Sequence, residues 1–422
     1  MPVDVTAVST AAPAGALRTS RILIIAGSDS GGGAGIQADI RTVTMLGGHA
    51  MTAITALTAQ NTLGVQAVHA IPAAMVVEQM RSCLHDIGAD AVKIGMIGSA
   101  ETVHAVADVL EPLGQAGVPI VFDPVMIATS GSVLADPETI GAFARLMRVA
   151  TLITPNAPEL AALTGRAVET ASDAMVAGRD LARETDAAVL AKGGHLTLGA
   201  AEQARSREAD ARDLVADHLI LPDGTDRVWT DPRIESQHTH GTGCTLASAI
   251  AEGLGRGLTL AHAIARARCF VRVALREAPG LGAGHGPMGH QRVRLDCDIG
   301  GATPNHVTLP ADDHAASISF YRALGLTMIV ESAGRYARFE SVGGTTLSVE
   351  AVDEIGDRPV IFVEVADLDS AVASARAQGI AVADPRVEPW GWREARLTDP
   401  AGNKLCLYVA GENRRFPPWR LV

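Results

Sequence analysis

Short apolar runs recur along the first two thirds of the chain, and each is followed by a longer stretch with helical spacing. The runs are RILIIAG (21–27), AVKIGMIG (91–98), VPIVFDPVM (118–126), TLITPN (151–156) and AAVLAKGGH (187–195). Uninterrupted apolar runs of this length are typical of parallel strands buried on both faces, and the stretches between them are long enough to form crossover helices. We therefore expect an α/β layered sheet with helices on both faces.

The pattern changes beyond a stretch rich in Gly and Pro. Alternating apolar and polar residues now dominate, beginning with HVTL (306–309). A weak internal repeat accompanies them, because residues 54 positions apart are of similar type. Examples are Val307 with Ile361 and Gly325 with Gly379. Alternation predicts strands, and a repeat of this length predicts two similar units. We expect a smaller α+β domain made of two βαβββ repeats.

These changes in pattern set the expected domain boundaries. The first residues lack the apolar core of a signal peptide, so they are expected to be disordered. The expected parts are a disordered leader at 1–20, a first domain at 21–284, a linker at 285–302, a second domain at 303–411 and a C-terminal tail at 412–422.

Composition and charge narrow the classes of partner. The 422 residues include 35 Lys and Arg against 47 Asp and Glu, a formal net charge of −12, and no segment gathers the basic residues that nucleic acid binding needs. No apolar run approaches the roughly 18 residues that span a bilayer. The five cysteines are odd in number and widely spaced, which favours neither a disulfide framework nor a zinc site. We expect a cytoplasmic protein that binds neither nucleic acid nor membrane.

The first strand runs into a glycine-rich segment, AGSDSGGGAGIQAD (26–39). Glycines permit tight turns and close approach of the backbone to a ligand, and the start of the following helix favours an anion. The segment lacks the GK[ST] of a Walker loop and the spacing of a dinucleotide fingerprint. Taken alone, it is equally compatible with a plain turn.

A second glycine-rich segment is HTHGTGCTLASAIAEGL (238–254), in which Gly241, Thr242 and Gly243 lead into a helix expected to begin near Thr245. Backbone N–H groups at such a start converge on an anion, which suits a transferring phosphoryl group. Cys244 is expected there as a stabilised thiolate that polarises an attacking hydroxyl. A buried structural cysteine beside a glycine turn is the alternative.

In combination, these segments resemble a known family. Together with TALTAQNTLGVQ (55–66), FDPVM, LITPNAPEL and AKGGH, they resemble the hydroxymethylpyrimidine and phosphomethylpyrimidine kinases of thiamine biosynthesis, members of the ribokinase-like superfamily. The resemblance covers residues 21 to about 284. It implies a ribokinase-like fold and ATP-dependent phosphorylation of 4-amino-5-hydroxymethyl-2-methylpyrimidine, and then of its monophosphate to the diphosphate.

The resemblance also implies which residues bind the pyrimidine. Gly27, Asp39 and Gln60 match positions that line the substrate pocket, and the amide of Gln60 suits an aminopyrimidine edge. Met96 and Met126 would give the flat ring apolar walls. Judged singly, each methionine is better explained by plain packing in the core.

For ATP and Mg²⁺, the resemblance implies a second set of residues. Asn156 and Glu159 match an N-x-x-E element that helps to hold Mg²⁺ through water, and Asp123 could contribute a carboxylate to the metal. Lys192 would approach the ATP phosphates, as would Thr242. By spacing alone, Asn156 and Glu159 could instead be a helix cap and a solvated charge, and Lys192 a surface charge.

Cys244 distinguishes branches of the superfamily. The resemblance implies that most members of the superfamily have Asp at this position, where it acts as catalytic base. The pyrimidine kinases instead have Cys, and this chain resembles them. The rate would then come mainly from positioning and from charge neutralisation by Mg²⁺, by Lys192 and by the amides of residues 241 to 244. A pyrimidine, ATP and a second copy of the chain in a homodimer are the expected partners.

The second domain resembles the vicinal oxygen chelate superfamily, which includes glyoxalases and bleomycin-resistance proteins. PNHVTL, SFYRALGL, VEVADLDSAVASARAQGI and LTDPAGNKLCLY carry the resemblance. Metal-dependent members place His or Glu at four positions, which read His306, Ser348, Val360 and Cys406 here. We therefore expect no metal, and a domain that binds a small molecule or serves as a structural or regulatory partner.

Two other functions remain open at this point. A pyridoxal or pyridoxine kinase would also phosphorylate a hydroxymethyl group on a heteroaromatic ring, although AQNT (59–62) and Cys244 argue against it. A ligand sensor of the thiamine pathway with a degenerate kinase fold is a different class. The intact GTGC segment, Lys192 and the N-x-x-E element argue against that class.

Overall fold

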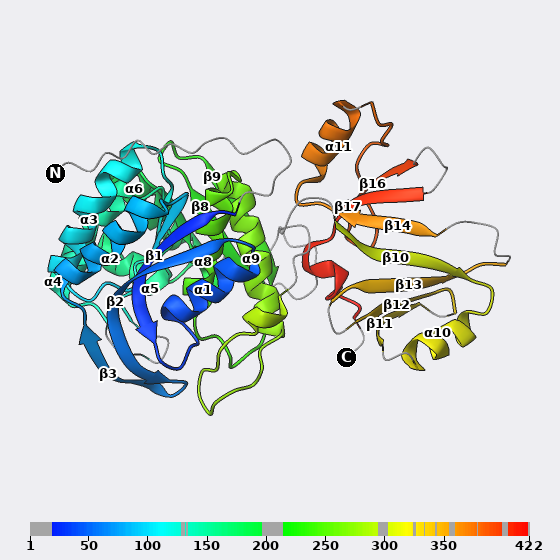
Figure 1. Cartoon of the computed structure of the whole chain (residues 1–422), viewed down its shortest axis with the longest axis horizontal. Coiled ribbons are helices and arrows are strands. Elements are labelled where there is room, and N and C mark those ends of the chain that lie inside the picture. Colours follow the sequence, from blue (N-terminus) through cyan, green and yellow to red (C-terminus); the bar gives the residue numbers. More distant parts are fainter. Residues whose placement is uncertain are drawn as a thin grey trace. The chain divides into compact units, whose positions relative to one another are not determined.

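The computed structural model of the chain contains two compact units, which divide between Val293 and Arg294 (Figure 1). The structure describes residues 19–127, 131, 134–195, 214–293, 303–323, 326–332, 334–341, 344–353, 359–377, 379–398 and 404–420. Most of the expected leader and residues 294–302 of the expected linker lie outside this description.

A nine-stranded sheet forms the middle layer of the first unit, in the order β3-β2-β1-β4-β5-β6-β7-β8-β9. Strands β2, β1, β4, β5, β6 and β7 pair in parallel, while β3, β8 and β9 are antiparallel to their neighbours. The strands are β1 (Arg21–Asp29), β2 (His49–Asn61), β3 (Gly64–Ala70), β4 (Ala91–Ile94), β5 (Ile120–Phe122), β6 (Leu152–Ile153), β7 (Ala188–Ala191), β8 (Leu214–Ile220) and β9 (Asp226–Pro232).

Helices cover both faces of this sheet. Apolar residues of α2 (Ala73–Asp86), α3 (Ala100–Gln115), α4 (Pro137–Val149), α5 (Ala157–Thr164) and α6 (Ala171–Thr185) share one buried cluster with side chains of the central strands. The opposite face is covered by α1 (Gly35–Met45), α8 (Thr242–Gly255) and α9 (Leu260–Arg276). The predicted layered α/β architecture is confirmed, and the five apolar runs form β1, β4, β5, β6 and β7.

The first unit continues past the expected boundary at residue 284. The amide of His240 donates to the carbonyl of Gly286 at 3.3 Å, and the amide of Gly289 donates to the carbonyl of Ala274 at 2.8 Å. His290 is fully buried, with Nε2 2.8 Å from the Thr245 hydroxyl. Residues 285–293 were expected in the linker because they are rich in Gly and Pro, but these contacts make them part of the first unit.

The second unit consists of an eight-stranded sheet in the order β11-β12-β13-β10-β14-β17-β16-β15, with two helices. Each half runs strand, helix and three strands, so the predicted βαβββ repeat is confirmed. The two repeats meet where β10 pairs with β14, and Val307 lies opposite Ile361. The elements are β10 (Thr303–Ala311), α10 (His314–Ala323), β11 (Thr327–Ser332), β12 (Tyr336–Glu340), β13 (Thr346–Ala351), β14 (Val360–Glu364), α11 (Leu368–Ala377), β15 (Arg386–Val387), β16 (Arg393–Thr398) and β17 (Lys404–Val409).

The segment expected to form a separate C-terminal tail also packs onto the second unit. A short helical turn covers Gly411–Arg414, and Arg414 is buried, donating to the carbonyl of Gly344 at 2.7 Å. Arg415 and Arg420 each form an ion pair with Glu340, at 3.0 and 2.7 Å. These ion pairs and the buried Arg414 tie the segment to the sheet, and the second unit therefore includes the expected C-terminal tail.

Candidate active site

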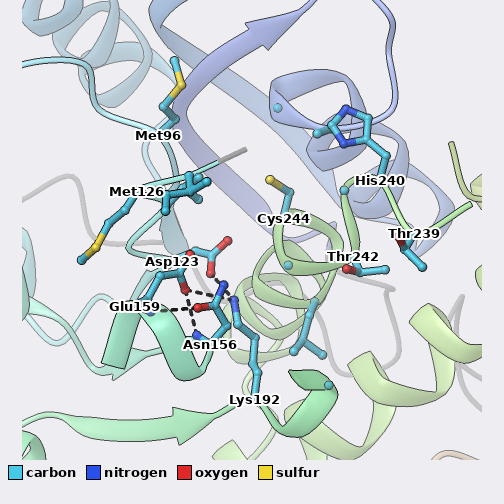
Figure 2. Close-up of a pocket in the computed structure, with 18 of the residues that line it drawn as sticks. Met96, Asp123, Met126, Asn156, Glu159, Lys192, Thr239, His240, Thr242 and Cys244 are labelled. Carbon is cyan, nitrogen blue, oxygen red and sulfur yellow. Dashed lines mark hydrogen bonds and ion pairs between the residues drawn. The ribbon is translucent and has the colours of Figure 1, made fainter. Parts of the chain in front are cut away.

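A pocket of about 820 Å³ opens at the edge of the first sheet where the parallel strands end (Figure 2). Gly27 lies near the end of β1, and the segments that follow β4, β5, β6 and β7 bring Met96, Asp123, Asn156 and Lys192 to the same edge. Ligand sites of open α/β sheets lie at this position. The predicted residues that line the pocket are Gly27, Gln60, Met96, Asp123, Met126, Asn156, Glu159, Lys192, Gly241, Thr242, Gly243 and Cys244.

Asp29 organises the glycine-rich loop after β1. Its carboxylate accepts hydrogen bonds from the backbone amides of Gly31 at 2.8 Å, Gly33 at 3.0 Å and Ala34 at 2.8 Å. These bonds and its contact with His240 lower the pKa of Asp29, overcoming the opposing effect of burial. Sequence reasoning missed Asp29, although an Asp just before a run of glycines is a signal for such a side-chain turn.

His240 connects this loop to the second glycine-rich segment. Its Nε2 lies 3.0 Å from Asp29 Oδ2 and 3.0 Å from the side-chain nitrogen of Gln60. A Cβ on Gly33 would overlap the His240 ring, and a Cβ on Gly241 would overlap the Gly33 carbonyl. The two segments therefore form adjoining walls of the pocket, although some 200 residues separate them.

Helix α8 begins at Thr242, three residues before the expected Thr245, with Gly241 as its N-cap. Gly241 has φ of +84°, which is open to glycine at little cost and strained for other residues. The first backbone N–H groups of a helix have no partner within the helix. The amide of Thr242 donates to the carbonyl of Thr239 at 3.3 Å, so the amides of Gly243 and Cys244 are the groups by which this helix start can bind an anion.

The thiol of Cys244 differs from the stabilised thiolate that the sequence predicted. Burial is the largest influence and raises its pKa to about 11, and the nearby Lys93 only partly offsets it. Cys244 is therefore a neutral thiol near pH 7. The helix start beside it does not overcome the loss of water around a thiolate in this site.

Alkylation of Cys244 by iodoacetamide should accelerate about tenfold per pH unit from pH 7 to about pH 10, because only the thiolate reacts and its fraction keeps rising below the pKa. Mass spectrometry of the peptide that contains Cys244 measures the rate. In concentrated urea the rate should instead level off above about pH 8.5, the value of a free thiol. A plateau below pH 8 in the folded protein would show a stabilised thiolate and contradict this result.

Lys192 lies between the carboxylate of Asp123, which follows β5, and that of Glu159 in the first turn of α5. Its Nζ is 2.8 Å from Asp123 Oδ1 and 3.8 Å from Glu159 Oε2 (Figure 2). The hydroxyl of Thr154 donates to Asp123 at 2.9 Å. The two carboxylates raise the pKa of Lys192 despite its burial. The lysine is therefore a permanent cation held inside the pocket, rather than a surface charge.

Asn156 and Glu159 begin α5 as a reciprocal cap. The Asn156 side chain accepts from the Glu159 amide at 2.9 Å, and Glu159 accepts from the Asn156 amide at 2.8 Å. The helix-cap interpretation is thus confirmed, whereas a solvated charge is wrong because Glu159 is only 6% exposed. Burial and the nearby Asp123 raise the pKa of Glu159 to about 7, against the effect of Lys192.

These side chains suit a hard cation. Asp123 and Glu159 offer carboxylate oxygens, and the raised pKa of Glu159 means that a cation would stabilise its ionised form. Within the described ranges no group of three or more His, Cys, Asp and Glu side chains could enclose a metal. Carboxylate oxygens are ligands that Mg²⁺ accepts while it keeps several waters.

Asp39 is not a pocket residue, contrary to the prediction. It lies on the buried face of α1 with no exposed surface, and its carboxylate pairs with Lys93 Nζ at 2.8 Å. Ser248 of α8 donates to its other oxygen at 2.7 Å. Asp39 therefore joins α1, β4 and α8 beneath the pocket instead of contacting a ligand.

Met96 and Met126 both lie along the pocket (Figure 2). Met126 is only 4% exposed, so it also packs in the core. A Cβ on Gly27 would lie 2.6 Å from the Met96 methyl group, so the glycine makes room for that side chain. These two methionines and the β1 backbone at Gly27 form part of the apolar side of the pocket.

Sequence reasoning also missed the residues around the turn that follows β7. Asp217 of β8 accepts from the amide of Gly193 at 2.8 Å, and it forms an ion pair with Arg268 of α9. Asp217 and Arg268 both line the pocket. They fix the turn next to Lys192, and only the fold reveals this because β8 and α9 are far from that turn in sequence.

In the second unit, two of the four positions of the metal pattern, His306 and Ser348, lie in contact, and the other two are Val360 and Cys406. His306 Nδ1 lies 2.7 Å from the Thr346 hydroxyl, and Nε2 lies 3.3 Å from the Ser348 hydroxyl. Cys406 donates to Glu394 at 3.4 Å, and Val360 has no donor atom in its side chain. Burial lowers the pKa of His306 well below its usual value, with Arg338 and Arg414 adding to the effect.

Among the helices that the structure describes, none is long and apolar enough to cross a membrane.

Two families match the chain. The phosphomethylpyrimidine kinase family matches residues 29–289, and the glyoxalase, bleomycin resistance protein and dioxygenase superfamily matches residues 303–407.

Known proteins resemble the first unit in sequence and in structure. The thiamine biosynthesis bifunctional protein ThiED of Geobacter sulfurreducens is 44% identical over 270 residues, which cover 64% of this chain and 52% of that protein. The chain thus spans about half the length of that relative. The hydroxymethylpyrimidine/phosphomethylpyrimidine kinase of Rhizobium meliloti is 43% identical over 277 residues, 64% of this chain and 97% of that protein. An ADP complex of Bacillus subtilis pyridoxal kinase gives a TM-score of 0.55 at 29% identity, covering 65% of this chain and 98% of that one.

Proposed function

Because the chain belongs to the phosphomethylpyrimidine kinase family, we propose that its first unit transfers a phosphoryl group from ATP to 4-amino-5-hydroxymethyl-2-methylpyrimidine, and then to the resulting monophosphate. One observation carries this proposal. A Cβ on Gly243 would lie 3.2 Å from Lys192 Nζ and 3.3 Å from Asp123 Oδ2. The helix start that can bind an anion, a permanent cation and a carboxylate therefore meet at one point of the pocket.

Phosphoryl transfer needs positioning and neutralisation of charge more than covalent chemistry. The amides at the start of α8 would hold the transferring phosphoryl group, and Lys192 would balance its negative charge. Asp123 and Glu159 would hold Mg²⁺, which would neutralise charge on the ATP phosphates when bound. Met96 and Met126 would pack against the pyrimidine ring, while Gln60 and His240 would contact its polar edge.

The two phosphorylations place different demands on Cys244. The first uses an alcohol, whose proton must leave, and the second uses a phosphate oxygen that is already ionised. With a pKa of about 11, Cys244 is protonated at neutral pH and does not start the reaction as a thiolate. We therefore assign Cys244 the positioning of the attacking oxygen through its S–H group. The alcohol proton passes to an oxygen of the transferred phosphoryl group, and most of the rate comes from the charges around that group.

The proposal is tested by ADP formation from ATP and Mg²⁺ with purified protein and one acceptor at a time. The pyrimidine alcohol and its monophosphate should each support turnover, and omission of Mg²⁺ should abolish it. Pyridoxal is the critical comparison because of the structural likeness to pyridoxal kinases. A kcat/KM for pyridoxal above that for both pyrimidines would replace the proposal with pyridoxal kinase activity. No turnover with any acceptor would favour a ligand sensor.

We also propose that two copies of the chain associate through the hairpin of β2 and β3. Apolar side chains on and beside it are exposed, Leu57 to 46%, Leu63 to 69% and Val68 to 52%. An exposed edge strand with apolar residues is a surface that proteins usually cover.

Light scattering should give a mass near twice the 43.7 kDa of the chain. The Val68→Asp variant should approach the monomer mass, because a charge would have to be buried in the interface. Val387→Asp, at an exposed residue of the second unit, is the control and should leave the mass unchanged. A monomer in the unmodified protein would reject this assembly.

For the second unit we propose a role in binding a small molecule without a metal. The support is the neutral His306 among hydroxyl groups, together with the lack of a donor atom at Val360.

A further inference from the structure

Arg338 lies in the middle of β12 and points away from the helices of the second unit. Its neighbours in the strand, Ala337 and Phe339, pack in a cluster with Ile318 and Tyr321 of α10. Since side chains of a strand alternate between the two faces, Tyr336 and Arg338 lie on the opposite face. Arg338 is only 4% exposed there.

The charge of Arg338 lacks a carboxylate partner among the described residues, which sets it apart from arginines nearby. Arg396 pairs with Glu394 at 2.6 Å, Arg414 with Glu364 at 3.4 Å and Arg415 with Glu340 at 3.0 Å. A cation removed from water without a counter-charge is costly. Among the described residues, no negative side chain therefore balances the charge of Arg338.

The groups that do contact Arg338 are neutral. Its Nε donates to the hydroxyl of Tyr336 at 3.0 Å, and Nη1 donates to the backbone carbonyl of Arg414 at 3.3 Å. The guanidinium carbon lies 4.5 Å from the ring centre of Trp392, a cation–π contact. These contacts orient the guanidinium, but none supplies a full negative charge.

Hydroxyl groups continue from Arg338 along the same face. The Tyr336 hydroxyl lies 2.6 Å from Ser348 Oγ, which is 3.3 Å from Nε2 of His306. Each hydroxyl can turn its hydrogen toward an anion. Arg414 adds positive charge, and together with Arg338 it contributes to the lowered pKa of His306.

We infer that Arg338 is the charged centre of a binding site for a small oxyanion, a carboxylate or a phosphate group, on the face of the second sheet opposite α10 and α11. An oxygen of the anion takes the place of the Arg414 carbonyl at Nη1, and the Tyr336 and Ser348 hydroxyls donate to the same group. Trp392 keeps its cation–π contact with the guanidinium. This site is separate from the proposed kinase pocket and does not depend on that function.

The test uses the full chain with 5-fluorotryptophan and fluorine NMR, because the indole of Trp392 contacts Arg338. A Trp392→Phe variant assigns the Trp392 signal among the four tryptophans. Acetate and inorganic phosphate are titrated separately at constant ionic strength, with chloride as the balancing salt. The Trp392 signal should shift and saturate in at least one of the two titrations, and the two midpoints tell whether carboxylate or phosphate is preferred.

Arg338→Met should raise the midpoint at least about tenfold, since a charge-assisted hydrogen bond is lost. Two variants should leave it within about twofold: Arg396→Met, which removes a paired arginine of the same sheet, and Lys192→Met, which alters only the first unit. If Arg338→Met does not fold, Tyr336→Phe keeps the ring and removes one donor, and should raise the midpoint several-fold. The inference is overturned if neither anion gives a saturating shift, or if the folded Arg338→Met or Tyr336→Phe protein keeps the original midpoint.

Discussion

Replacing Lys192 by Met should lower kcat for the pyrimidine alcohol by about 10²- to 10³-fold, the usual effect of removing one group that stabilises charge in a transition state. Lys192 lies 2.8 Å from Asp123 and next to the start of α8, where the phosphoryl group is proposed to bind. Methionine keeps the length of the side chain and removes only the charge. Steady-state kinetics of ADP formation with each pyrimidine acceptor would measure the loss.

Arg166→Met is the matched control, because it removes an arginine whose ion pair with Asp180 lies on the surface. It should leave kcat within about twofold, as surface pairs contribute little. The circular dichroism and melting of both variants should show that they remain folded. An unchanged kcat in folded Lys192→Met would remove the lysine from the transition state.

Replacing Lys93 by Met should destabilise the first unit by about 3–5 kcal/mol, the cost of leaving one member of a buried ion pair alone. Both Lys93 and Asp39 have no exposed surface, so water cannot replace the missing partner. Urea unfolding would measure the loss of stability. Monitoring it by hydrogen exchange of the β1 and β4 amides with mass spectrometry restricts the measurement to the first unit.

A double variant separates the charge from the packing. When Asp39→Asn is added to Lys93→Met, no charge remains buried, and part of the lost stability should return. The two single losses should then add up to clearly more than the loss in the double variant. Strict additivity would mean that the two side chains do not act as a pair, in spite of the 2.8 Å between them.

Most of the first unit could be predicted because its central strands are buried on both faces. Such strands must be apolar along their whole length, so RILIIAG and the runs like it are visible without knowledge of their neighbours. The strands at the edges of the sheet could not be predicted as well as the central strands. Strand β3 is largely exposed and carries a mixture of polar and apolar residues, which has no clear period.

The site was predictable to the extent that its residues lie within local motifs. Lys192, Asn156 and Glu159 each follow a strand, and strands of one sheet place their ends together. The contact of His240 with Asp29 has no local signature, because 211 residues separate the two. Asp39 was misplaced because its motif gives the position on α1 but not the face of the helix toward which the carboxylate points.

The packing of residues 285–293 sets the point at which a second module can be joined to this kinase. Gly286 accepts from the backbone of His240, and His290 contacts Thr245, one residue after Cys244. A gene fusion with its junction before Gly286 would exchange these contacts for foreign sequence and disturb the start of α8. A junction after Val293 leaves them intact, so we expect that a partner attached at that point does not disturb the start of α8.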